Sequence, residues 1–104
     1  MKCAVTALAT FALLAGCTTL AEDERARYLA AQEVFTATVE GLAELREADA
    51  FTEAEADRIT AAIRAGKEGL LAWGDALLRG ETDGIARAAV YEAIATLSAY
   101  RRNG

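Results

Sequence analysis

The chain has 104 residues, a formal net charge of −5, and neither histidine nor proline. The lack of histidine excludes a Ser-His or Cys-His nucleophile pair, and the acidic charge argues against nucleic acid, whose binding depends largely on phosphate neutralisation. The length suits one small domain, and the abundance of alanine, leucine, glutamate and arginine favours an all-α fold, because these residues are strong helix formers.

Residues 1–17 have the organisation of an export signal. Lys2 supplies one positive charge, and a mainly apolar run follows it as far as Leu14. A positive start before a short apolar run is typical of a secretory signal peptide. The run has about a dozen residues, whereas a membrane-spanning helix needs roughly 20. We therefore expect a cleaved signal helix, separate from the domain, over residues 4–15.

The apolar run ends in Leu14, Ala15, Gly16 and Cys17. This stretch resembles the lipobox of bacterial lipoprotein precursors, a likeness confined to residues 1–17. It implies that the Cys17 sulfur receives a diacylglycerol, that cleavage falls between Gly16 and Cys17, and that the new amine is acylated. A cysteine suits this role because its thiolate is a good nucleophile. The alternative is an ordinary signal peptide cleaved after Cys17, with Ala15 and Cys17 at the small-residue positions.

The lipobox resemblance implies where the protein is located and what it binds. The signal peptide would comprise residues 1–16, and lipidated Cys17 would begin a short tether, 17–21. Several acyl chains make membrane release negligible, so the membrane is the expected partner. With Cys17 committed to lipid and no histidine, neither a metal nor another cofactor is expected. Thr18 is not the aspartate that directs inner-membrane retention in some lipoproteins, which favours the outer membrane, facing the periplasm.

The first helix of the mature domain is predicted from about Leu20 to about Ala48, with Thr19 and Glu22 as a capping box. An apolar stripe recurs at helical spacing and comprises Tyr28, Ala31, Phe35, Thr38, Val39, Leu42 and Leu45. The opposite face carries Glu33, Glu40, Glu44 and Glu47. This face is either a site for a cation or basic partner or, as we favour, an ordinary solvated surface.

A second helix is predicted from Glu53 to about Arg79, because Thr52 and Glu55 form a clear capping box. Its apolar stripe comprises Ala56, Ile59, Ile63, Gly66, Leu70, Trp73 and Leu77, widened by Leu71 and Leu78. Beside it runs a row of small residues: Ala62, Ala65, Gly69, Ala72 and Ala76. Small residues let another backbone approach closely, and we favour packing within the domain over a groove for a partner helix.

Gly80 can adopt the left-handed conformation that ends the second helix, and Thr82 or Asp83 would cap a third helix from about Gly84 to Arg101. Arg101 and Arg102 suit the negative end of the helix dipole, and a contact with an anionic partner is the alternative.

Three helices with short connections predict an antiparallel up-down-up three-helix bundle over residues 22–104, with helices at about 20–48, 53–79 and 84–101. The predicted core comprises Tyr28, Phe35, Leu42, Leu45, Ile59, Ile63, Leu70, Trp73, Leu77, Val90, Ile94 and Leu97.

We interpret the chain as a small lipid-anchored envelope protein and a non-catalytic helical interaction module, with another envelope protein as its partner. The candidate interaction surface is Glu33, Glu40, Glu44, Glu47, Arg101 and Arg102. The alternative is a structural or self-associating envelope lipoprotein, and both interpretations rest on class analogy. An enzyme would have to use carboxylates such as Glu40 and Glu44. It is least favoured because a small bundle offers little concave volume, and no catalytic residue is assigned.

Overall fold

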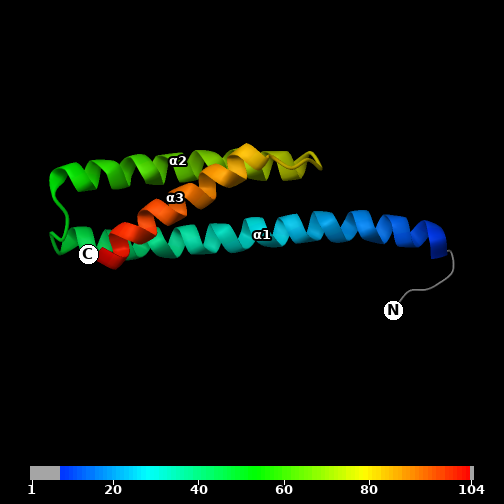
Figure 1. Ribbon diagram of the computed structural model, residues 1–104, viewed down its shortest axis with the longest axis horizontal. Helices are drawn as coiled ribbons and strands as arrows, with labels where there is room; N and C mark the ends of the chain where they lie inside the picture. The colour runs from blue at the N-terminus through cyan, green and yellow to red at the C-terminus, as the bar shows by residue number, and fades with distance from the viewer. Residues whose placement is uncertain (1–7, 104) are drawn as a thin grey trace.

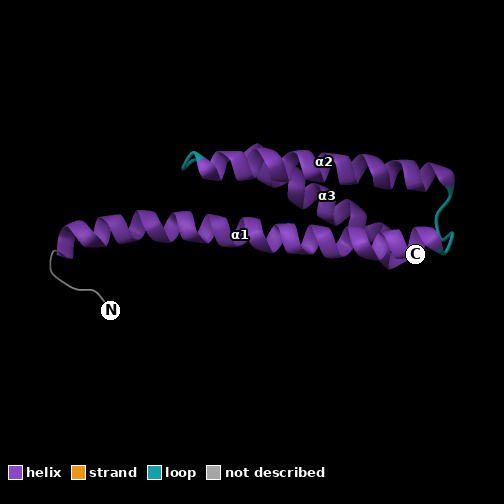
Figure 2. Cartoon of the chain, turned by 180° about the vertical axis from the view of Figure 1, so that it is seen from behind, coloured by secondary structure: helices purple, strands orange, loops and turns teal. Residues whose placement is uncertain are grey.

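The computed structural model describes the backbone of residues 8–103 and the side chains of residues 22–102. Its helices are α1 (Leu8–Glu47), α2 (Glu53–Leu78) and α3 (Gly84–Asn103). Helices α1 and α2 run antiparallel, and α3 crosses them obliquely from the end of α2 to the end of α1 (Figures 1 and 2). The predicted all-α, up-down-up bundle is confirmed, and α3 packs most extensively against α2.

Helix α1 begins earlier than the sequence predicts. Part of the predicted separate helix, residues 4–7, lies outside the described residues, but from Leu8 onward the chain is continuous with α1. The prediction of a signal helix separate from the domain was therefore wrong. The predicted helix start at Leu20, with Thr19 as its N-cap, was also wrong. The chain contains no proline that would break this helix, and Gly16 and Gly41 each cost only about 1 kcal/mol of helix propensity. Residues 17–21, expected as a tether, are helical, and α1 projects beyond the turn between α2 and α3 (Figure 1).

The predicted starts of α2 and α3 and the predicted end of α2 are confirmed, whereas α3 continues past Arg101 to Asn103. The Glu55 amide donates to Thr52 Oγ1 at 3.1 Å, and the Thr52 amide donates to Glu55 Oε1 at 2.9 Å, which completes the capping box. At α3, the Ala86 amide donates to Asp83 Oδ1 at 2.9 Å, so Asp83 rather than Thr82 is the cap. Gly80 has a φ of 74° and provides the left-handed turn after α2.

Helix α1 is followed by an aspartate in the left-handed conformation that usually requires glycine. Asp49 has a φ of 57°, a left-handed conformation in which a side chain is normally unfavourable. The amide of Ala50 donates to the carbonyl of Leu45 at 3.0 Å and so satisfies a carbonyl at the end of the helix. Aspartate is among the few residues that tolerate this conformation, and it takes the place that glycine usually fills.

The core contains fewer large residues than predicted. The predicted residues that are buried are Phe35, Leu42, Ile59, Leu70, Trp73, Val90 and Leu97, whereas Tyr28, Leu45, Ile63, Leu77 and Ile94 are half-buried against them. Alanines complete the core: Ala31, Ala76, Ala86 and Ala93. Thr38 is also buried, and its hydroxyl donates to the carbonyl of Val34 at 2.7 Å. Leu71 and Leu78, expected to widen the buried stripe of α2, are instead 69% and 88% exposed.

Glycines on α2 explain this narrow core. The ring of Phe35 occupies the space that a Cβ of Gly66 would need. A Cβ on Gly69 would lie 2.9 Å from Val90 Cγ2 and 3.1 Å from the carbonyl oxygen of Ala86. These glycines therefore serve close packing within the domain, as favoured from the sequence. Because the helices approach closely there, a narrow stripe buries the interface and the outer leucines stay outside.

The substitution Gly66→Ala tests this packing. Helix propensity alone would stabilise the protein by about 1 kcal/mol. We expect a net loss of about 1–2 kcal/mol instead, because overpacking a core costs roughly 1–3 kcal/mol and the new methyl group meets Phe35. Urea denaturation measures the difference. Gly84→Ala is the control, since nothing lies within 4 Å of its Cβ position, and it should cause no loss. Equal behaviour of the two variants would contradict the packing argument.

Candidate functional site

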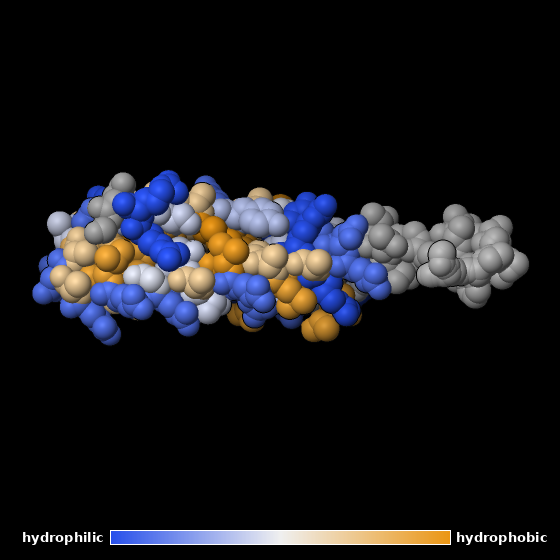
Figure 3. Space-filling model, turned by 90° about the horizontal axis from the view of Figure 1, so that it is seen from below, coloured by the Kyte–Doolittle hydropathy of each residue, from blue (hydrophilic) through white to orange (hydrophobic). Residues whose placement is uncertain are grey.

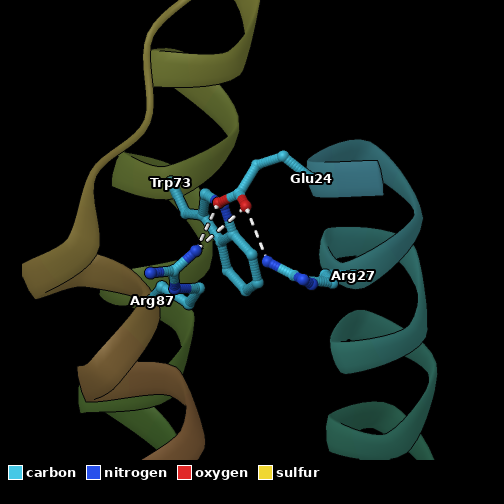
Figure 4. A network of polar contacts seen from close by, with 4 residues as sticks. All are labelled: Glu24, Arg27, Trp73 and Arg87. Carbon is cyan, nitrogen blue, oxygen red and sulfur yellow. Dashed lines mark hydrogen bonds and ion pairs between the residues drawn. The ribbon is translucent and has the colours of Figure 1, made fainter. Parts of the chain in front are cut away.

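A buried carboxylate joins all three helices (Figure 4). Glu24 of α1 is only 5% exposed. Its Oε2 accepts a hydrogen bond from Trp73 Nε1 of α2 at 2.9 Å. Arg87 of α3 donates to Oε1 at 2.9 Å and to Oε2 at 3.1 Å, and Arg27 lies 3.6 Å from Oε1. One side chain thus links positions 49 and 63 residues away in the sequence.

Aromatic side chains hold the indole in place. Trp73 is fully buried, and its ring meets Tyr28 edge-on at 5.3 Å and Tyr91 at 5.9 Å between ring centres. Such edge contacts stabilise beyond simple burial. Among the residues whose side chains are described, no buried polar side-chain atom lacks a hydrogen-bond partner. Both oxygens of Glu24 are therefore engaged with neighbours, and the arrangement suits a structural tie rather than a free general base.

The sequence contains a pattern that predicts the Glu24–Trp73 hydrogen bond, and our sequence analysis did not recognise it. Glu24 lies four residues before Tyr28 and seven before Ala31, on the face of the apolar stripe. Trp73 was assigned to the core without an acceptor for its N–H group, although a buried tryptophan usually has one. A carboxylate on a buried stripe and a core tryptophan together indicate such a pair. The choice of Arg87 as third partner depends on how α3 crosses the bundle.

We expect Glu24→Ala to lower the free energy of unfolding by about 2–4 kcal/mol. Breaking a buried ion pair costs roughly 3–5 kcal/mol, and the one-third exposure of the Arg87 side chain reduces that cost. Urea denaturation followed by Trp73 fluorescence measures the effect. Glu40→Ala, which removes an exposed glutamate from the same helix, should stay within about 0.5 kcal/mol of the parent. If both variants were equally stable, the network would have no energetic role.

The predicted charged surface is solvent-exposed throughout. Exposed side chains are found at Glu33, Glu40, Glu44, Glu47, Arg101 and Arg102. A Cβ on Gly41 would lie 3.0 Å from Arg101 Nε, so Arg101 lies across α1 at Gly41. The structure thus brings Arg101 against the helix that carries the four glutamates.

Among the described side chains, the pKa of Arg58 is the one that is clearly shifted. The Tyr100 hydroxyl beside Arg58 raises the pKa of this guanidinium, and the nearby Glu55 acts in the same direction. An arginine is charged throughout the physiological range in any case, so this shift creates no pH switch.

A shallow apolar hollow of about 260 Å³ lies between α1 and α3. It is lined by Arg27, Ala30, Ala31, Val34, Tyr91 and Ile94. Val34 and Tyr91 are 49% and 45% exposed, which leaves apolar surface uncovered there. Seen from the α1 side, apolar side chains form a broken band bordered by hydrophilic ones (Figure 3). We call this hollow the α1–α3 groove.

A smaller hollow of about 120 Å³ lies near the turn between α1 and α2, beside Val39, Phe51 and Ile63. Neither hollow is lined by a carboxylate, so Glu40 and Glu44 do not meet in a pocket. Within the described part of the chain, no three acidic or cysteine side chains lie close enough to hold a metal ion. The side chains of Leu14, Ala15, Gly16 and Cys17 are outside the described residues, so the lipidation site stays a prediction.

Comparison with known proteins gives no match to a family model, a curated protein or a solved structure. None of the helices, over the residues that were searched, is both long and apolar enough to cross a membrane.

Proposed function

We propose that this protein is a bacterial lipoprotein that a lipidated Cys17 anchors to the outer membrane, where it acts as a non-catalytic interaction module facing the periplasm. The observation that carries the anchor is the sequence Leu14-Ala15-Gly16-Cys17 at the end of a short apolar run that follows a single lysine. The run is too short for a membrane-spanning helix, which needs roughly 20 apolar residues. Covalent lipid is the means of attachment that remains consistent with this pattern.

Radioactive palmitate fed to cells that produce the protein tests the anchor. The parent should be labelled and should fractionate with the outer membrane, whereas Cys17→Ala should lose the label, because no sulfur remains to be acylated. Cys3→Ala is the matched control and should be labelled like the parent, since the signal peptide is removed. Persistent labelling of the Cys17→Ala variant would refute the assignment.

The interaction role is supported by the α1–α3 groove. Its lining is almost entirely apolar, and Val34 and Tyr91 at its rim are half exposed. Exposed apolar patches bordered by polar residues are typical of protein contact sites. The charged residue of the lining is Arg27, so a partner with an apolar anchor and an acidic neighbour would fit the groove best.

Site-specific photocrosslinking in intact cells tests this role. A crosslinker at Val34 should give an adduct with another envelope protein, and a crosslinker at the exposed Ala72 of α2 should not. The substitution Tyr91→Asp should weaken the Val34 adduct, because it places a charge beside the apolar contact. An adduct between two copies of this chain would instead favour the structural, self-associating alternative. Equal adducts from Val34 and Ala72 would contradict a specific surface.

A further inference from the structure

Two apolar side chains flank the turn between α2 and α3 without cover. Leu78 is the last residue of α2 and Ile85 is the second residue of α3. They are 88% and 85% exposed, more than the other exposed large hydrophobic residues of the described chain. Neither contributes to the core or lines either hollow. The packing of the bundle therefore does not account for them.

The height of this turn along the bundle follows from the contacts between α1 and the antiparallel α2. Glu24 and Trp73 bond through extended side chains, and the closer contacts of Phe35 with Gly66 and of Tyr28 with Gly74 set Leu78 roughly level with Asp23. Cys17 therefore lies about 9 Å farther along α1, at the same end of the bundle as Leu78. Figure 1 shows this arrangement, with the α2–α3 turn beside the early part of α1.

The charges of the turn do not oppose contact with a lipid surface. Arg79 and Glu81 form an ion pair with each other at 3.2 Å, so their charges cancel. The carboxylate of Asp83 accepts the Ala86 amide and offsets the positive end of the α3 dipole. On α1 at this end, the exposed Glu22 and Asp23 are offset by the exposed Arg25 and Arg27. The apolar side chains of Leu78 and Ile85 thus flank a turn of nearly neutral charge.

We propose that the α2–α3 turn is a second membrane contact, in which Leu78 and Ile85 enter the interface of the bilayer that holds the acyl chains of Cys17. This proposal rests on the proposed lipidation. Apolar side chains that contact a bilayer reach about 5–10 Å below its surface, and an adjacent covalent anchor keeps them at that surface. A second contact beside α1 stops the bundle from swivelling about its anchor. It holds the α1–α3 groove at a fixed orientation to the membrane.

The test places a fluorescent label at the turn of the processed, lipidated protein. After processing, Cys3 is gone and Cys17 is a thioether, so Leu78→Cys supplies the only free thiol. The protein, purified from membranes in detergent, is reconstituted in phosphatidylcholine vesicles and labelled with an environment-sensitive dye. The matched control is Leu71→Cys, an exposed leucine on the same face of α2, one heptad or about 10 Å farther from the anchor.

The Leu78→Cys label should show blue-shifted emission and quenching by spin-labelled lipids, and the Leu71→Cys label should show neither. Emission typical of water at both positions, in acylated protein that floats with the vesicles, would overturn the second contact and leave the anchor intact. A blue shift at Leu78→Cys without lipid quenching would mean that protein, such as a second copy, covers the turn. This outcome would also overturn the proposal. Protein that mass spectrometry shows to be unacylated, and that does not float, would overturn the anchor and this inference together.

Discussion

The arrangement of the bundle depends on the carboxylate of Glu24. The direct contact between α1 and α2 is the least extensive of the three helix pairs, so α1 is held largely through α3, through Tyr28 and Phe35 packed on α2, and through the Glu24 side chain. A buried carboxylate is costly unless charge and hydrogen bonds compensate it, and Arg87 and Trp73 provide both. The geometry that satisfies Glu24 is therefore the geometry that sets α1 against the other two helices.

The second constraint is how closely α2 approaches its neighbours. Gly66 and Gly69 lie under Phe35 and Val90, and alanines rather than leucines fill much of the remaining interface. Close approach of this kind buries a narrow strip of each helix. As a consequence, several large apolar side chains stay outside the core and are available for contacts with other molecules, among them Val34 at the α1–α3 groove and Leu78 at the α2–α3 turn.

The continuity of α1 connects the fold to the proposed anchor. The sequence predicted a short tether at 17–21. The structure has helix there instead, so the proposed lipid attachment is joined to the bundle by a stiff element. The Glu24 tie lies about two turns farther along the same helix. A lipid at Cys17 would then affect the orientation of the groove as well as the location of the protein.

The sequence by itself determined the features that depend on neighbouring residues. The capping box at Thr52 and Glu55, the Gly80 turn, the three helices and most of the large core residues follow from spacing and local backbone chemistry. The lipobox is likewise a linear motif, and its function stays a prediction. Only the tertiary structure decided that Glu24 pairs with Arg87 and Trp73, that Asp49 takes a left-handed conformation, and that Leu71 and Leu78 stay outside. These outcomes depend on how closely the helices approach and at what angle they cross, and helical periodicity specifies neither quantity.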